Sequence, residues 1–324
     1  MKQTDVLALG TALVEFTPQH LGASVAAADA YDALPSGATT NFCLALARLG
    51  IRVSLATRIG EDELGKWLLH KLQHFGVDTS PTRAVAGQYT PVSFAWMNQD
   101  GAKTFYFYRF PGYSDPMLEF AAEPLTDDEL RQARLFDFSE ATVRAEPLRS
   151  VSLDTARRAR ELGLQVAYAV NYRPGAWREP VEQIVAVQRQ ALALADLALM
   201  NREEAALITG DDEIRPESLA ALGPRLLAIT AGAEGAHVYH EGKLTFIPPR
   251  EVEVRYDIGA GDTFHAGLLA ALLHGYDPVE AASLASAAAA LRICRTADMN
   301  CLPTWAEVLT MATNEGPTLE GAPL

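Results

Sequence analysis

The chain has 324 residues, of which 49% are hydrophobic and 21% are charged, which is typical of a globular protein and argues against extended disorder. Its formal net charge of −14 disfavours a nucleic-acid partner, because nucleic-acid phosphates bind basic surfaces. The cysteines Cys43, Cys294 and Cys301 form no CxxC pair, so neither a zinc site nor a disulfide framework is predicted. The N terminus has no signal-peptide pattern and no segment is apolar enough to span a membrane, so we expect a cytoplasmic protein without a membrane partner.

Strand-like and helix-like segments alternate through most of the chain. Buried strands are predicted at residues 6–10, 52–60, 134–140, 164–170, 196–200 and 225–232, and helices at residues 40–50, 63–76, 155–163, 182–195 and 201–210. A hairpin around Glu241-Gly242 is predicted at residues 236–249, and two helices follow at residues 261–275 and 278–293. This order predicts a mostly parallel sheet covered by helices on both faces.

Residues 88–110 break the alternation, because QYTPVSFAWMNQDGAKTFYFYRF predicts two strands around Asp100-Gly101. A hairpin inserted into an α/β chain is typical of a flap over a site or of an oligomer contact. The tail at residues 313–324 is rich in glycine and proline, and we expect it to be disordered.

The run Gly259-Ala260-Gly261-Asp262-Thr263-Phe264 begins an apolar helix. Its glycines allow a ligand to approach the backbone, and the first N–H groups of a helix attract oxyanions. Asp262 could accept a proton from an attacking hydroxyl. The alternative is an ordinary helix cap after a glycine-rich turn. The run fits neither the GxGxxG pattern of dinucleotide-binding proteins nor a phosphate-binding loop ending in GK[ST]. His265, which follows the run directly, is expected to pack within the helix and not to act as a base.

The run GAGDTFHAG is similar to the C-terminal signature of the ribokinase-like (PfkB) carbohydrate kinases. Four other motifs of that family precede this run, in the family's order. LPSGATTNFCLALARLG resembles its GGxxxN segment, and TRIGEDELGKWLLHKLQHFGVDTS resembles the block after it. NREE resembles its NxxE element, and ITAGAEGAHVY resembles its TxGxxG element. The resemblance implies a three-layer α/β/α domain with a central, mostly parallel sheet and a small β lid. Residues 1–312 would form this single domain, with lid strands from about 11–40 and 87–112.

The resemblance also implies ATP and Mg²⁺ as cofactors, with Asp262 as catalytic base and the N–H groups of Gly259, Ala260 and Gly261 as the anion hole. From the residues alone, Asn201 and Glu204 read as a capping box. The resemblance adds that Asn201 lies on the nucleotide side and that Glu204 organises Mg²⁺ through water. It likewise places three residues of the TxGxxG element beside the nucleotide: Thr230, Gly232 and Gly235.

On the sugar side, Gly37 and Asn41 match the GGxxxN segment, although a plain turn explains them equally well without the family. Glu15 stands where relatives usually carry an Asp that binds sugar hydroxyls. Tyr108 and Arg109 end the flap and are expected either to reach a substrate hydroxyl or carboxylate or to face solvent at an exposed edge. Two further substrate-binding candidates come from NYRPGAW, which resembles a segment of fructokinase-like and 2-keto-3-deoxygluconate kinase-like members: Asn171 and Arg173.

Several positions depart from the family pattern. Tyr256 and Asp257 replace the first Asp and the Thr of D-T-x-G-A-G-D, a neighbourhood that helps bind a monovalent cation in several members. The resemblance therefore does not carry K⁺ dependence to this chain, and Asp257 is the candidate for compensating. Ser36 replaces the first Gly of GGxxxN, and Ala169 replaces an acidic residue often found before Asn171.

The predicted activity is phosphoryl transfer from ATP to a primary hydroxyl of a small sugar or sugar acid. Fructose is the first candidate and 2-keto-3-deoxygluconate the second, with ribose or a nucleoside as further alternatives. A sugar-sensing protein on a degenerate kinase scaffold is the rival from another class, and a nicotinamide-dependent oxidoreductase is a remote third. A homodimer through the flap is expected because a two-stranded ribbon is marginal by itself.

Overall fold

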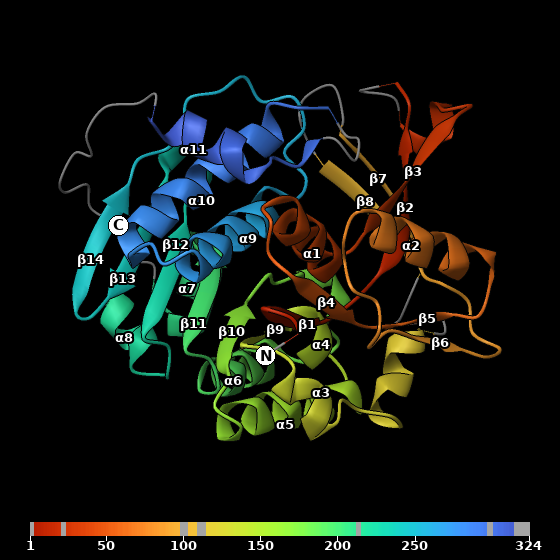
Figure 1. The fold of residues 1–324 in the computed structure, drawn as a ribbon, viewed down its shortest axis with the longest axis horizontal. Coiled ribbons are helices and arrows are strands. Elements are labelled where there is room, and N and C mark those ends of the chain that lie inside the picture. The colour runs from red at the N-terminus through yellow and green to blue at the C-terminus, as the bar shows by residue number, and fades with distance from the viewer. Residues whose placement is uncertain are drawn as a thin grey trace.

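The computed structural model describes residues 3–20, 24–97, 103–108, 115–211, 215–296 and 301–313. Its main sheet has eight strands in the order β14-β13-β12-β11-β10-β9-β1-β4 (Figure 1). The strands from β4 to β12 pair in parallel, whereas β13 pairs antiparallel with both of its neighbours, β12 and β14. The pair β13–β14 is the predicted hairpin. The bounds of these strands are β1 (Val6–Leu9), β4 (Val53–Ala56), β9 (Leu135–Ser139), β10 (Gln165–Ala169), β11 (Leu197–Asn201), β12 (Leu226–Thr230), β13 (Ala236–His240) and β14 (Lys243–Ile247).

Helices cover both faces of the main sheet, as Figure 1 shows. One face carries α1 (Ala38–Arg48), α9 (Ala260–Leu273) and α10 (Pro278–Ile293), with α11 (Trp305–Thr313) packed on α10. The other face carries α3 (Asp127–Arg131), α4 (Glu140–Val143), α5 (Leu148–Glu161), α6 (Val181–Leu192), α7 (Arg202–Thr209) and α8 (Pro216–Ala220). The three-layer α/β/α prediction is therefore confirmed.

The two faces of the sheet have separate hydrophobic cores because side chains alternate along each strand. In β1, Val6 and Ala8 belong to the core under α1, α9 and α10, whereas Leu7 and Leu9 belong to the core under α5 and α6. A strand buried on both sides reads as the continuous apolar run VLAL, which is how the sequence indicated a parallel sheet.

A second sheet of four strands, in the order β3-β2-β7-β8, stands at one end of the main sheet (Figure 1). Its strands are β2 (Leu13–Pro18), β3 (Tyr31–Ser36), β7 (Val92–Met97) and β8 (Lys103–Tyr108), with β7 and β8 antiparallel. We call this sheet the lid. Residues 109 and 110 of the predicted flap and residues 314–324 of the predicted tail lie outside the described residues.

The prediction of a single strand at residues 52–60 is wrong, because this segment forms two strands that belong to different sheets. It breaks at Thr57 into β4 and β5 (Arg58–Gly60), and β5 pairs with β6 (Arg83–Val85). The sulfur of Met117 accepts hydrogen bonds from the Thr57 hydroxyl at 3.2 Å and from the Arg58 N–H at 3.1 Å. These bonds hold the chain away from the main sheet at the break.

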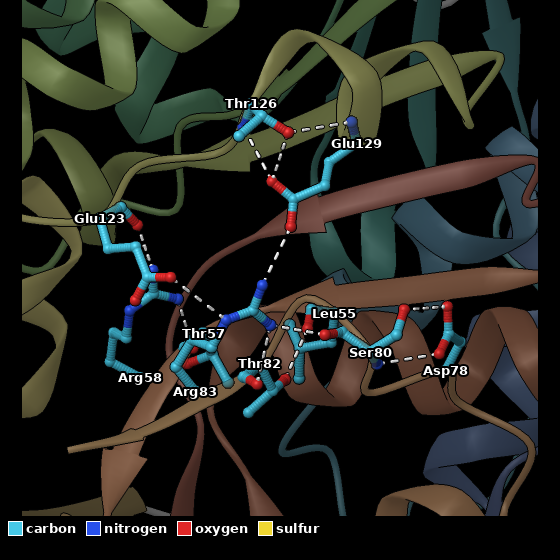
Figure 2. Close-up of polar contacts among 10 residues, drawn as sticks. All are labelled: Leu55, Thr57, Arg58, Asp78, Ser80, Thr82, Arg83, Glu123, Thr126 and Glu129. Carbon is cyan, nitrogen blue, oxygen red and sulfur yellow. Dashed lines mark hydrogen bonds and ion pairs between the residues drawn. The ribbon is translucent and has the colours of Figure 1, made fainter. Parts of the chain in front are cut away.

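An arginine network fixes this small sheet against the segment between the lid and β9 (Figure 2). Arg83 bonds Glu129 at 3.1 Å and lies 3.7 Å from a carboxylate oxygen of Glu123, while the Arg58 guanidinium donates to the Glu123 carbonyl. Glu129 also closes the capping box of α3 with Thr126. The remaining elements are α2 (Glu63–His74) and the 3₁₀ turns η1 (Val25–Ala27), η2 (Pro116–Ala121), η3 (Pro174–Ala176) and η4 (Gly232–Glu234).

The predicted helices are present, although two of them begin at least two residues earlier than the sequence indicated. The helix expected at residues 155–163 begins at Leu148, and the helix expected at residues 40–50 begins at Ala38. The final helix, α11, was not predicted. Within the described ranges, no helix combines the length and the apolar character needed to cross a bilayer.

Candidate active site

The first turn of α9 brings Asp262 to the end of the main sheet beside the lid. Gly259 adopts the left-handed conformation, with φ +84°, at the N-cap of α9, a conformation that disfavours any side chain. Asp262 is half-buried in this turn, and its Oδ2 accepts a hydrogen bond of 3.0 Å from Nδ2 of Asn41. The Ala260 N–H donates to the Asp257 carbonyl at 3.3 Å, whereas the Gly259 and Gly261 N–H groups have no backbone acceptor among the described residues. The turn therefore presents two backbone donors and one carboxylate.

Asn41, which bonds Asp262, lies in the first turn of α1, and the N-cap of this helix, Gly37, is a position that only glycine can occupy. Gly37 has φ +111°, and a Cβ at this position would lie 2.6 Å from the carbonyl oxygen of Thr11. The Asn41 N–H donates to the Gly37 carbonyl at 2.8 Å and so closes the first turn of α1. The GGxxxN resemblance thus has a steric basis at its second glycine.

Glu15 and Ser36, two departures from the family pattern, contact each other. Ser36 at the end of β3 donates a hydrogen bond of 3.1 Å to Oε2 of Glu15 on β2. Glu15 is 6% exposed, and burial raises the pKa of its carboxyl, while the bond from Ser36 and the charge of Arg292 lower it. Both side chains line a hollow that also contains Asn41 and Gly259. A serine in place of glycine supplies the hydroxyl that the longer Glu15 side chain uses.

Arg292 is a charged residue of this hollow that the sequence did not single out. It projects from the last turn of α10, is 8% exposed, and donates from Nη1 to the Tyr256 carbonyl at 3.3 Å. Its guanidinium lies 5.3 Å from the centre of the buried Tyr256 ring. The only signal in the sequence was an arginine after the alanine run AAAALR, which reads equally well as a favourable charge at a helix C terminus.

Burial raises the pKa of Asp262, and its neighbours oppose that effect. The hydrogen bond from Asn41 lowers this pKa, and the positive charges of Arg173 and Arg292 lower it further. A carboxyl in these surroundings is tuned by three named partners that approach from different parts of the chain. Such tuning is characteristic of groups that accept or donate protons in active sites.

Glu204 is held at the start of α7 by two backbone donors. Its Oε2 accepts from the Asn201 N–H at 2.8 Å and its Oε1 from the Tyr172 N–H at 2.6 Å. The Asn201 side chain accepts from the Glu204 N–H at 2.8 Å, so the predicted capping box is confirmed. Burial raises the pKa of Glu204, which is 6% exposed. The NREE and NYRP segments are therefore joined directly through this carboxylate.

The NYRPGAW segment runs from the end of β10 toward α6. Asn171 has φ +38°, a strained conformation for a residue that is not glycine. Arg173 follows, and its charge acts on Asp262. Trp177 donates its indole N–H to the buried carboxylate of Glu140, which also pairs with Arg144 at 2.5 Å. The tryptophan of this motif thus anchors the segment to Glu140.

The predicted nucleotide-side residues lie together at the carboxyl ends of neighbouring strands. Asn201 at the end of β11 is in register with Thr230 at the end of β12. Gly232 begins η4 and Gly235 follows it with φ +97°, and the Ala231 N–H closes this loop on the Gly235 carbonyl at 2.8 Å. Ligands of open parallel sheets bind at this edge.

Some predicted residues are not brought together with Asp262. Tyr108 lies on the edge strand β8, is 45% exposed, and contacts the Phe94 ring 6.0 Å away. The lid strand β7 separates it from Glu15 on β2. Arg109 lies outside the described residues. Asp257 is half-buried beside the α9 turn, and the described part of the chain contains no cluster of three or more His, Cys, Asp or Glu side chains able to hold a metal.

His265 packs in α9 as expected. Its ring stacks on Phe42 with centroids 4.4 Å apart, and burial lowers its pKa to about 3, so the imidazole is neutral. Its Nε2 lies 3.2 Å from Oδ1 of Asp137, a carboxyl on β9 whose pKa is raised well above the usual range by burial and by the charge of Asp262. A protonated Asp137 donating to neutral His265 would give both buried atoms a partner.

Comparison with known proteins agrees with this geometry. The sequence model of the family described as "pfkB family carbohydrate kinase" matches residues 3–305. Fructokinase-1 of Zea mays is 30% identical over 321 residues, which cover 94% of this chain and 97% of that protein. The chain belongs to the pfkB family of carbohydrate kinases, and it is a sugar kinase.

Solved structures give the same result. The fructokinase of Xylella fastidiosa with bound ATP has a TM-score of 0.85 and 25% sequence identity, covering 97% of this chain and 99% of the other. Aminoimidazole riboside kinase of Salmonella enterica, complexed with aminoimidazole riboside and an ATP analogue, has a TM-score of 0.80 and 26% identity, covering 95% and 99%. The ribokinase-like fold expected from the sequence is confirmed.

Proposed function

We propose that this sugar kinase transfers the γ-phosphoryl group of ATP to a primary hydroxyl of a small ketose, with fructose as the first acceptor. The observation that carries the proposal is the position of Asp262, which projects from the N terminus of α9 next to Asn41 and the hollow of Glu15. Similarity to fructokinases across almost the whole chain supports fructose.

In this reaction Asp262 takes the proton of the attacking hydroxyl. The N–H groups of Gly259 and Gly261 face the developing charge of the phosphoryl group, because an anion at a helix N terminus is stabilised by unpaired donors and by the helix dipole. The Ala260 N–H contributes once it leaves its long bond to Asp257. Glu15, Asn41 and Gly37 position the acceptor, and a carboxylate is a suitable acceptor for sugar hydroxyls.

Nucleotide binding is assigned to the edge formed by Asn201, Thr230, Gly232 and Gly235. A bound Mg²⁺ supplies charge neutralisation for the β- and γ-phosphates. Both Glu204 oxygens already accept backbone N–H groups, which fits a role through metal-bound water and not direct ligation. We further propose that Asn171 and Arg173 orient the acceptor and the phosphate, and that Tyr108 and Arg109 contact the acceptor.

One specific observation favours a second acceptor class. Arg292 places a buried positive charge in the hollow of Glu15, which suits a sugar acid such as 2-keto-3-deoxygluconate. We therefore propose the sugar acid as the second candidate acceptor.

A coupled assay of ADP production over fructose, 2-keto-3-deoxygluconate, ribose and a nucleoside tests the proposal. We expect ATP-dependent turnover with at least one ketose or keto acid, and Asp262→Asn should lower kcat by about a hundredfold or more while sugar binding persists in calorimetry. Turnover of Asp262→Asn at the wild-type rate would rule out the assigned base. Sugar binding by the wild type without any ADP release would instead indicate a sensor.

A further inference from the structure

Arg292 is a buried cation that touches the catalytic turn without belonging to any motif of the chain. Its guanidinium lies beside Gly259, because a Cβ built on that glycine would be 3.8 Å from Arg292 Nε and 3.9 Å from Nη2. The same Cβ position is 3.8 Å from Nδ2 of Asn41, the donor to Asp262. Two nitrogen donors therefore flank the first residue of the turn from opposite elements, α10 and α1.

The charge of Arg292 has no close counter-charge in the described ranges. Its hydrogen bond there goes to the Tyr256 carbonyl, and none of the ion pairs between described residues includes it. Glu15 and Asp262 feel its charge, since it lowers the pKa of both carboxyls. A buried guanidinium with a single neutral acceptor is costly unless a ligand completes its surroundings.

The residues that line the hollow indicate where such a ligand would bind. Arg292 lines it together with Glu15, Ser36 and Asn41, which come from the lid and from α1, and not with Asn201 or Thr230 at the nucleotide edge. The planar fork of an arginine matches the paired oxygens of a carboxylate or of a phosphoryl group.

We propose that Arg292 is a ligand-binding residue that holds an anionic oxygen of the reactants beside Gly259, on the acceptor side of the site. This inference rests on the proposed function, in which two groups carry such oxygens. One is the phosphoryl group in transfer, and the other is the carboxylate of an acidic acceptor. A lysine at the same position keeps the charge but lacks the two-pronged donor, so it should restore only part of the effect.

Steady-state kinetics of Arg292→Gln and Arg292→Lys with ATP and either fructose or 2-keto-3-deoxygluconate test this proposal. The matched control is Arg295→Gln, which removes an arginine two residues past the end of α10. This arginine pairs with Glu307 at 2.6 Å. If the carboxylate is the ligand, Arg292→Gln should raise KM for the acid by about 10- to 150-fold and leave fructose unaffected. If the phosphoryl group is the ligand, kcat should fall by a similar factor with both acceptors at unchanged KM.

Kinetics of both variants equal to those of Arg295→Gln with both acceptors would overturn the proposal. Arg292→Lys keeps the test open if the glutamine variant does not fold. Calorimetric titration of 2-keto-3-deoxygluconate and of MgATP into wild type and Arg292→Lys separates this proposal from the proposed function. A wild type that turns over no sugar refutes the function, whereas equal affinities of the two proteins for both probes, together with an unchanged kcat of Arg292→Lys, refute the role of Arg292.

Discussion

Nδ2 of Asn41 donates a hydrogen bond of 3.0 Å to Oδ2 of Asp262, although the two residues are 221 positions apart. The bond joins the first turns of α1 and α9, which lie side by side on the main sheet (Figure 1). Burial favours the neutral form of Asp262, whereas this bond favours the charged form and so lowers the pKa of the carboxyl. The geometry of one helix terminus thus influences the pKa of a carboxyl on another.

Asn41→Ala should shift the pH dependence of the kinase. Without the amide donor the pKa of Asp262 rises further, and the base is ionised only above that pKa. The acid limb of kcat against pH should therefore move to higher pH, and kcat at neutral pH should fall. The control is Gln73→Ala. It removes an exposed amide of α2 that donates a hydrogen bond of 2.8 Å to the Thr79 hydroxyl. An acid limb that stays in place in Asn41→Ala would contradict the coupling.

Glu204→Gln separates the structural role of this residue from its role toward Mg²⁺. An amide keeps one acceptor oxygen, but its NH₂ group must face a backbone N–H of Asn201 or Tyr172. An unsatisfied buried donor costs about 1–3 kcal/mol, so the free energy of unfolding in denaturant titration should fall by that amount. If Glu204 also organises the metal, the Mg²⁺ concentration for half-maximal activity should rise.

The neighbouring Glu203→Gln serves as control, because Glu203 is exposed in the same turn of α7. A loss of stability in Glu204→Gln with an unchanged Mg²⁺ requirement would leave only the capping role.

Local chemistry made part of this site predictable. The glycines around Asp262 and the spacing of Asn201 and Glu204 are features of helix termini, which depend on neighbouring residues alone, and the apolar runs of β1 and β11 reveal burial on both faces. These local patterns therefore predicted the fold and the site residues at the N termini of α9 and α7.

The remainder depends on contacts between distant segments. Arg292 looks like an ordinary C-terminal helix charge until the fold places it beside Gly259. At the break at Thr57 the chain bonds the sulfur of Met117, which is far along the chain, and no turn residue marks the break. The side chain of Ser36 likewise gains its meaning only from Glu15 on the adjacent strand.

Asp137→Asn should change how stability depends on pH. Burial and the charge of Asp262 raise the pKa of Asp137 in the folded protein, whereas the unfolded chain has the ordinary value of about 3.9. Between those two values the folded protein keeps a proton that the unfolded chain releases, so this group stabilises the fold less as pH rises. The amide cannot ionise, and it can still donate to Nε2 of His265.

The difference in Tm between Asp137→Asn and wild type should therefore become more positive from acid to mildly alkaline pH. Thermal unfolding followed by circular dichroism at several pH values measures it. Asp128→Asn, at a side chain that is 90% exposed, is the control and should show no such trend. A constant difference for Asp137→Asn at every pH would mean that the carboxyl is not protonated in the fold.

Gly267→Ala should loosen the contact between α9 and α10, the two helices that carry Asp262 and Arg292. A Cβ on Gly267 would lie 2.9 Å from Cα of Ala285 and 3.1 Å from Cβ of Ala288, so the helices must move apart. Overpacking of this kind costs about 1–3 kcal/mol, which exceeds the gain of roughly 0.5–1 kcal/mol from replacing a helical glycine by alanine. Denaturant unfolding should report the net loss, and activity should fall with it because Arg292 shifts relative to Gly259.

Gly175→Ala is the matched control, since nothing lies within 4 Å of its Cβ position. Equal stabilities of the two variants would show that α9 and α10 adjust without cost.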